Sequence, residues 1–295
     1  MRERLTNCPL CKSGLFLNHA EITDYSISGE KFLLCKCSSC KLIFTNPRPT
    51  QESIGPYYNS ENYISHQDNP NNLVNRIYRT VRFFTLKKKV NWINQYAPHK
   101  GNLLDIGCGT GHFLAEASKA GWNTVGVEPN ETAREHAKLK KLNVHQSLEE
   151  IGPNERYQVI TLFHVLEHIH DLRKSTKKLI KLLDKEGSLL IAVPNYQSYD
   201  SQYYGKYWAS LDVPRHLYHF TQESMQQLAE NFDLQIVSQE PMLFDSYYVA
   251  MLSEKYLQTK GFKAYFKALK TGFISNWKAR SRNNYSSILF ILKKK

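Results

Sequence analysis

The sequence predicts an α/β fold with a mostly parallel sheet, preceded by a small N-terminal module. Between residues 102 and 240, short apolar segments alternate with segments of helical periodicity, which is typical of β-α-β units. Residues 102–113 read NLLDIGCGTGHF, an apolar strand that ends in an acid and a glycine loop and leads directly into a helix. A chain of 295 residues, 41% of them hydrophobic, can hold one such domain of about 200 residues and an appendage.

The N-terminal module, residues 1–48, contains two C-x-x-C pairs, Cys8 with Cys11 and Cys37 with Cys40. Two such pairs separated by 25 residues predict a tetrahedral zinc site in a ribbon-like module with strands at 31–34 and 41–45. Cys35 is a spare thiol that could replace Cys37. Such a module either recognises a partner or is held together by its zinc, and the second interpretation is favoured because zinc supplies folding energy to small modules.

Residues 49–98 form a linker and a helical segment. The stretch 46–63 is rich in proline and tyrosine and has no clear periodicity, which indicates an extended connection. Residues 72–96 show approximate helical spacing of apolar side chains, and Pro98 ends the helix.

Residues 99–252 form the predicted core, and each of its elements follows from the alternating pattern. We expect strands at residues 103–106, 124–127, 144–146, 158–163, 188–193 and 234–238. We expect helices at residues 113–120, 132–140, 172–183 and 224–230. The remaining residues, 253–295, form a basic helical segment followed by a last core strand at 287–292.

The glycine loop is suited to a ligand that is not a pyrophosphate. Glycines at 107, 109 and 111 remove Cβ atoms that would keep a ligand from the backbone. The dinucleotide fingerprint G-x-G-x-x-G fails, because His112 stands where its third glycine is needed. Asp105 places a carboxylate at the end of the strand, which favours a cationic ligand or one rich in hydroxyl and ammonium donors.

Glu128 ends the second predicted strand, about 20 residues beyond the glycine loop. A carboxylate at this place can accept hydrogen bonds from both hydroxyls of an adenosine ribose. Taken alone, Glu128 would be interpreted as an exposed turn acid. Together with Asp105 and the glycines it indicates a nucleoside-type cofactor.

These features resemble motif I and its surroundings in the class I S-adenosylmethionine (SAM) methyltransferases, and the likeness extends over about residues 102–241. With the cysteine module and the Asn46-Pro-Arg-Pro linker, the layout resembles a bacterial subgroup with an N-terminal zinc module. The resemblance implies a Rossmann-like, seven-stranded, mostly parallel sheet with SAM as cofactor. The cofactor-binding residues that it implies are Asp105, Gly107, Cys108, Gly109, Gly111, Glu128, Pro129, Gln146, Ser147 and Phe163. Many family members carry an acid after the third strand, but here Gln146, Ser147 or a backbone carbonyl must meet the adenine.

A histidine-rich segment supplies the catalytic candidates. His164, Glu167 and His168 are spaced i, i+3 and i+4, and His216 and His219 follow about 50 residues later. Histidine is suited to act as general base near neutral pH if the acceptor is a hydroxyl or an activated C–H. Metal-dependent small-RNA methyltransferases hold a divalent ion with a similar E-x-x-E-H pattern and a distant histidine, but here the first member is histidine. A hydrogen-bonded Glu167–His168 pair that only shapes the pocket is a further alternative.

The net charge of +12 is concentrated near the C-terminus, where residues 254–295 contain eleven Lys or Arg and one acid. Large apolar residues between 257 and 277 follow a helical stripe with lysines around it. Packing on the core as a lid is the default interpretation. Contact with an anionic membrane and RNA binding are the alternatives.

The leading functional hypothesis is a SAM-dependent methyltransferase for a small-molecule acceptor. Its expected acceptor is a sugar, a nucleotide sugar or another cell-surface or secondary-metabolite precursor, methylated on oxygen or carbon. An RNA methyltransferase of the ribosomal type is the alternative, although the core lacks an (Asn/Asp)-Pro-Pro-(Tyr/Phe) segment. A non-catalytic SAM-binding scaffold is a third. No apolar run reaches the ~20 residues of a membrane span, and the first residues lack an apolar signal region, so a cytoplasmic location is expected.

Overall fold

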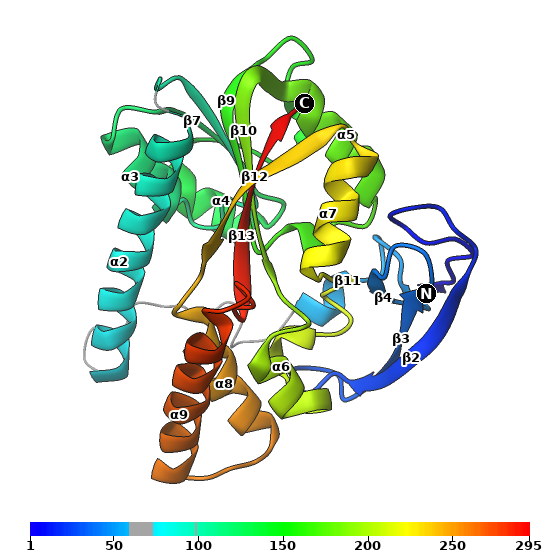
Figure 1. Ribbon diagram of the computed structural model, residues 1–295. Coiled ribbons are helices and arrows are strands. Elements are labelled where there is room, and N and C mark those ends of the chain that lie inside the picture. Colours follow the sequence, from blue (N-terminus) through cyan, green and yellow to red (C-terminus); the bar gives the residue numbers. More distant parts are fainter. Residues whose placement is uncertain (59–72, 98) are drawn as a thin grey trace.

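The computed structural model describes residues 1–58, 73–97 and 99–295, with only the backbone described for residues 73–80. Its centre is a seven-stranded sheet with the order β12-β13-β10-β9-β6-β7-β8 (Figure 1). The strands are β6 (Asn102–Ile106), β7 (Asn123–Val127), β8 (Asn143–His145), β9 (Tyr157–Phe163), β10 (Leu183–Pro194), β12 (Leu234–Pro241) and β13 (Ser287–Lys294). Only β13 runs antiparallel to its neighbours. The predicted Rossmann-like, mostly parallel seven-stranded sheet is confirmed, and so is its last strand near residues 287–292.

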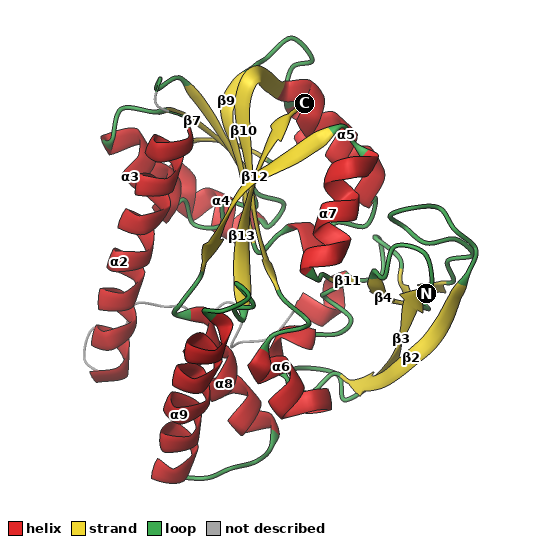
Figure 2. Ribbon diagram, viewed as in Figure 1, coloured by secondary structure: helices red, strands yellow, loops and turns green. Residues whose placement is uncertain are grey.

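Helices cover both faces of this sheet (Figure 2). They are α2 (Leu73–Tyr96), α3 (His112–Lys119), α4 (Glu131–Lys138), α5 (Leu172–Leu182) and α7 (Gln222–Asn231). The short helix α6 (Tyr199–Tyr204) lies outside these layers, beyond the carboxyl ends of the parallel strands (Figure 1). Successive residues of β10 point to opposite faces, as the two-residue period of a strand requires. Leu189 and Ile191 pack in one core with α5 and α7, whereas Leu190 and Ala192 pack in the other with α2 and α3.

The N-terminal module forms two antiparallel sheets, a two-stranded one and a larger one that it shares with the core. Its strands are β1 (Arg2–Glu3), β2 (Phe16–Thr23), β3 (Lys31–Cys37), β4 (Ile43–Thr45) and β5 (Arg48–Pro49). A short core strand, β11 (Tyr218–His219), pairs with β4 and completes the four-stranded order β11-β4-β3-β2. The module is therefore joined to the segment that contains His216.

Short 3-10 helices connect several elements. They are η1 (Gly55–Tyr58), η2 (Leu148–Glu150), η3 (Leu166–His168), η4 (Gly205–Tyr207) and η5 (Ala209–Leu211). Part of the predicted linker 46–63 and the predicted helix start at Asn72 lie outside the described residues. In the part of the chain that is described, none of the helices combines the length and apolar character needed to cross a membrane.

The basic segment forms a helical hairpin inserted between β12 and β13. It consists of α8 (Asp245–Tyr256) and α9 (Phe262–Ala279), with a break at Gly261, whose φ is +63°. Packing of the apolar stripe on the core was the expected arrangement, and it is wrong. The stripe of α9 is exposed, because α9 packs through small residues on its other side: Ala268, Thr271, Gly272, Ser275 and Ala279.

Candidate functional site

The glycine loop connects β6 to α3 at the carboxyl end of the sheet. Gly107, Gly109 and Gly111 all have positive φ, which side chains with a Cβ resist. A Cβ on Gly107 would lie 2.5 Å from Cγ2 of Val165, so packing requires glycine there. A Cβ on Gly109 would meet nothing within 4 Å, so this part of the loop borders open space that a ligand can enter.

Two buried carboxylates flank the loop. Asp105, at the end of β6, accepts a hydrogen bond of 2.6 Å from Thr161 Oγ1 of β9. Glu128 follows β7 and accepts hydrogen bonds from the backbone N–H of Gly109 (2.8 Å) and of Asn130 (2.9 Å). Burial raises the pKa of Asp105 to about 7, although Thr161 and Lys89 oppose the shift. The predicted pair of acids therefore lies at neighbouring strand ends beside an open loop.

Lys89 of α2 is a residue of this site that the sequence did not reveal. Its ammonium lies 3.9 Å from the centroid of the Phe163 ring, at the end of β9, and interacts electrostatically with Asp105 and Asp245. Burial lowers the pKa of Lys89. In the sequence Lys89 is the last of three consecutive lysines, so no pattern distinguished it from an exposed residue.

The other predicted cofactor residues make different contacts within the protein. Cys108 is buried and points toward Gly126, so only its backbone faces the loop. The carbonyl of Pro129 accepts a hydrogen bond from Arg134. Gln146 donates its backbone N–H to Glu150, and Ser147 precedes η2. Adenine recognition by Gln146 or Ser147 stays a prediction.

His164 stands directly after β9 and has a φ of +58°. Its Nε2 lies 2.9 Å from Oδ2 of Asp245, at the start of α8, and its Nδ1 lies 3.5 Å from Oε1 of Glu167. Burial alone would lower the pKa of His164, but these two carboxylates raise it to about 10. His164 is therefore a cation near neutral pH, which argues against the predicted role as general base.

His168, His216 and Glu167 form a compact cluster. One ligand atom of each lies within 4.8 Å of the others. Nδ1 of His168 lies 3.0 Å from the carbonyl oxygen of Arg215, and Nδ1 of His216 lies 2.8 Å from that of Ser210. A carbonyl can only accept, so both Nδ1 atoms donate, and a neutral imidazole held in this way keeps its lone pair on Nε2.

Burial, together with the neighbouring His216, lowers the pKa of His168 to about 4, so the imidazole of His168 is neutral at physiological pH. Glu167 is fully buried, and neither carboxylate oxygen has a hydrogen-bond partner among the described residues. Burial raises the pKa of Glu167, but His164 and its other histidine neighbours bring it below its usual range. The ion pair with His164 is the contact that offsets the charge of Glu167, and a buried carboxylate that lacks hydrogen bonds is costly, which indicates that it serves a bound group or proton. His219, the remaining candidate, is buried, and burial lowers its pKa to about 3.

The N-terminal module holds this cluster in place. Thr45 of β4 donates its hydroxyl to the carbonyl of His216 (3.0 Å) and its N–H to that of Leu217 (3.0 Å). The N–H of Leu217 in turn donates to the carbonyl of Glu167 (2.8 Å). Arg215 makes buried ion pairs with Asp24 of the module (2.8 Å) and with Asp212 (2.7 Å).

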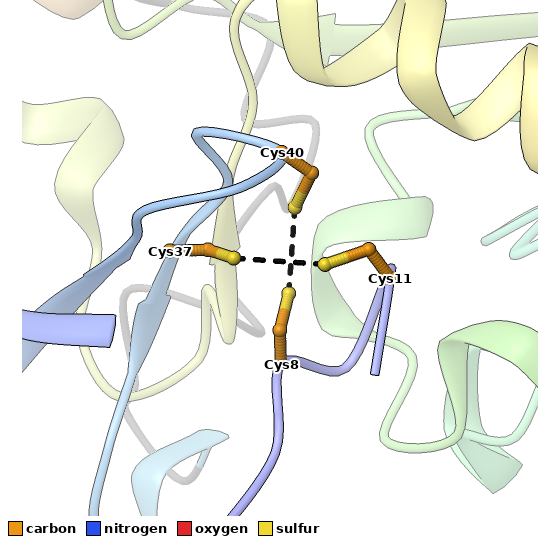
Figure 3. A group of neighbouring side chains, drawn as sticks. All are labelled: Cys8, Cys11, Cys37 and Cys40. Carbon is orange, nitrogen blue, oxygen red and sulfur yellow. Dashed lines mark hydrogen bonds between the residues drawn. The ribbon is translucent and has the colours of Figure 1, made fainter. Parts of the chain in front are cut away.

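The four predicted zinc ligands converge on one point (Figure 3). Their sulfur atoms all lie within 4.8 Å of one another, with Cys8 and Cys40 at 3.4 Å and Cys11 and Cys37 at 3.6 Å. Tetrahedral zinc with bonds of 2.3 Å needs sulfurs about 3.8 Å apart, so the four thiols fit the ion. Cys35 lies elsewhere, with its sulfur 3.8 Å from Oδ1 of Asn18, so it does not replace Cys37.

Known proteins are similar to this chain in part of its sequence and in fold. A family model described as "Methyltransferase domain" matches residues 78–239, more than half of the chain. The ubiquinone biosynthesis O-methyltransferase of Rhodopseudomonas palustris is 25% identical over 156 residues, covering 48% of this chain and 62% of that protein. Its counterpart in Pelagibacter ubique is 33% identical over 100 residues, covering 32% and 42%. The chain thus spans about three fifths or less of these relatives.

Magnesium protoporphyrin IX methyltransferase from Synechocystis, solved with bound S-adenosylhomocysteine, has a similar fold. The TM-score is 0.53 at 16% sequence identity, and the likeness covers 81% of this chain and 97% of that one. At this identity the likeness concerns the fold alone. The family match, the sheet order and the glycine loop between two acids agree, and the chain belongs to the class I SAM-dependent methyltransferases.

Proposed function

We propose that the protein transfers the methyl group of SAM to a small-molecule acceptor, on a hydroxyl oxygen. The observation that carries this proposal is the open glycine loop flanked by Asp105 and Glu128 at neighbouring strand ends. The family match and the relatives named O-methyltransferases support it. A sugar, a nucleotide sugar or a related cell-surface or secondary-metabolite precursor remains the proposed acceptor class.

The site has suitable groups for both ends of the cofactor. Glu128 would accept hydrogen bonds from the ribose hydroxyls, and Asp105 would face the ammonium of the methionine part. The ring of Phe163 faces the ammonium of Lys89, which shows that this end of β9 accommodates a cation beside an aromatic ring. Because the sulfonium is a good leaving group, the protein mainly has to align acceptor oxygen, methyl and sulfur, and such orientation lowers the barrier by several kcal/mol.

His168 and His216 would remove the proton of the acceptor hydroxyl. Their Nε2 lone pairs are fixed by the carbonyls that hold Nδ1, and Glu167 stabilises the imidazolium that forms. His164 instead contributes a fixed positive charge between Asp245 and Glu167. The proton therefore moves from the acceptor oxygen to Nε2 of His168 or His216 as the methyl group is transferred.

A pH dependence of SAM affinity follows from Asp105. With the pKa of Asp105 near 7, lowering the pH from 7.5 to 5.5 protonates the carboxylate that faces the cationic cofactor. The association constant should fall as pH drops below 7, approaching about tenfold per unit. Calorimetric titrations across this range measure the effect. In Asp105→Asn the profile should be flat, and an equally steep profile in that variant would assign the effect to another group.

Chelation distinguishes the base role from a metal role of the same cluster. Glu167, His168 and His216 also make a suitable donor set for a divalent cation, and the lack of hydrogen bonds to the oxygens of Glu167 favours that alternative. If the imidazoles act as bases, EDTA should leave methyl transfer unchanged as long as metal analysis shows the zinc of the four cysteines retained. His168→Ala should lower kcat by about 100-fold or more with SAM affinity retained. Loss of activity in EDTA that added Mg²⁺ or Mn²⁺ restores would assign the cluster to a metal.

The proposed activity is tested by methyl transfer from labelled SAM to fractions of cell extract, followed by identification of the labelled product. A labelled small hydroxyl compound is the expected result. Label on carbon would move the acceptor class to activated C–H compounds. Retained SAM binding without transfer to any fraction would favour the scaffold hypothesis.

One observation favours the RNA alternative. A cleft along α5 has six basic side chains in its lining, beside the acids Glu149 and Asp171; the basic residues are Lys12 of the N-terminal module, Arg173, Lys174, Lys177, Lys178 and Lys181. If RNA is the acceptor, its binding should be strong, weaken steeply with salt and depend on this face. Label in ribosomal RNA would support this function, and transfer that is indifferent to RNA would exclude it.

A further inference from the structure

We propose that the exposed face of the α8–α9 hairpin binds the surface of an anionic lipid bilayer. This inference goes beyond methyl transfer and does not depend on it. The hairpin projects beyond the carboxyl ends of the parallel strands, away from the sheet (Figure 2).

The apolar face of α9 is large and uncovered. Six large apolar side chains recur at helical spacing and are 53–83% exposed: Phe262, Tyr265, Phe266, Leu269, Phe273 and Trp277. Soluble proteins rarely expose contiguous apolar surface of this kind unless it binds something. The opposite face of α9 is already packed through small residues, so the aromatic face cannot turn inward without breaking that contact.

The charges beside this face select the partner. Lysines of α9 flank the apolar stripe, and Lys263 and Lys270 are exposed. No acidic residue occurs between 255 and 295. A helix with an apolar face and a basic flank matches the boundary between acyl chains and anionic headgroups.

A second copy of the chain fits this face less well. Pairing two such faces about a two-fold axis would bring the lysines of both copies together with no acid on α9 to compensate them. RNA fits less well too, because the lysines flank the aromatic residues instead of lying among them. The bilayer alone satisfies the apolar centre and the basic flank together.

The hairpin begins beside the proposed methyl-transfer site, so a bilayer bound to it would lie close to that site. Asp245, the first residue of α8, makes the ion pair with His164 beside the proposed methyl-transfer position. A bilayer under α9 would therefore lie next to the catalytic cluster. An acceptor anchored in or adsorbed to that surface would reach the site without crossing the solvent.

Vesicle binding tests the proposal with the full chain, in the absence of SAM. The protein should float with phosphatidylcholine vesicles that contain phosphatidylglycerol, and bind vesicles of phosphatidylcholine alone at least about tenfold more weakly. The double variant Phe266→Ser, Phe273→Ser should lose binding to the anionic vesicles by about tenfold or more. Lys263→Glu with Lys270→Glu should weaken binding and remove most of its salt dependence.

Matched controls use residues that are equally exposed but lie elsewhere. Leu17→Ser with Leu139→Ser removes two large apolar side chains, 72% and 80% exposed, and should leave vesicle binding unchanged. Lys177→Glu with Lys181→Glu makes the same charge change on α5 and should have little effect. All replaced side chains are exposed, so the thermal midpoints of the variants should match that of the parent protein.

Three results would overturn the proposal. If the Phe266→Ser, Phe273→Ser variant binds anionic vesicles as well as its Leu17, Leu139 control does, the hairpin does not make the contact. Dimers in lipid-free solution that this variant dissociates would assign the face to a second copy. RNA binding that the Lys263, Lys270 variant abolishes, with no vesicle binding by the parent protein, would assign it to RNA.

Discussion

Replacing Asp105 or Glu128 by alanine is expected to abolish measurable SAM binding. Glu128 would accept hydrogen bonds from two ribose hydroxyls, and each bond to a charged acceptor contributes about 1.5–3 kcal/mol, so their loss predicts at least about 100-fold weaker binding. Asp105→Ala removes the carboxylate that faces the cationic end of the cofactor and leaves Thr161 without its acceptor. Titration calorimetry with SAM measures both effects.

Two further variants separate the lost contact from lost structure. Glu128→Gln keeps one acceptor oxygen for the N–H of Gly109 and should bind SAM more weakly than the parent but better than Glu128→Ala. Asp184→Ala removes an acid near the amino end of β10, at the end of the strands opposite the glycine loop, and this variant should bind SAM with the affinity of the parent. Unchanged affinity in both Asp105→Ala and Glu128→Ala would defeat the cofactor assignment.

The fold could be predicted because its information is local. Strands of the sheet are short apolar segments bounded by turn residues, and their parallel direction follows from strand–helix alternation. The acid and glycine pattern at 105–111 could be interpreted because its spacing does not match the dinucleotide fingerprint and so favours SAM over a dinucleotide. The same holds for the cysteines, since two C-x-x-C pairs at this spacing are typical of a zinc site.

The features of the site that could not be predicted depend on contacts between segments far apart in the sequence. Asp245 reaches His164 from a helix about 80 residues away, and Lys89 approaches Phe163 from the helix that precedes the core. Neither partner has a local pattern that marks it. These contacts decide the chemistry, since Asp245 helps to make His164 a cation and so leaves the base role to His168 and His216.

The α8–α9 hairpin shows a second limit of prediction from sequence. A helical stripe looks the same in sequence whether a core, a lid or a bilayer covers it. The small residues on the other side of α9 are the informative feature, because a helix packs closely through its small side chains and then leaves its large ones outside. Periodicity gave the helix, but the direction of its aromatic face came only from the packing against α8.

Replacing Cys37 by serine is expected to unfold the N-terminal module and to disable the catalytic cluster while SAM binding persists. Structural zinc contributes about 10–16 kcal/mol in small zinc peptides, more than a module of this size gains from its own core. Loss of the module would release Thr45 from His216 and Leu217, and Arg215 from Asp24. Metal analysis should fall from about one zinc per chain to much less, and limited proteolysis should cut within the first 50 residues.

Cys35→Ser is the matched control, because Cys35 lies on the same strand two residues away, is also buried, and points away from the four thiols. It should retain zinc, protease resistance and methyl transfer. The glycine loop, Asp105 and Glu128 lie at the parallel sheet and not in the module, so the Cys37→Ser variant should bind SAM within a few-fold of the parent. Its methyl transfer should fall by about 100-fold or more, which is the loss expected without a positioned base. Full activity in zinc-free Cys37→Ser protein would show that the module does not hold the cluster, and equal loss of SAM binding would show that zinc stabilises the whole chain.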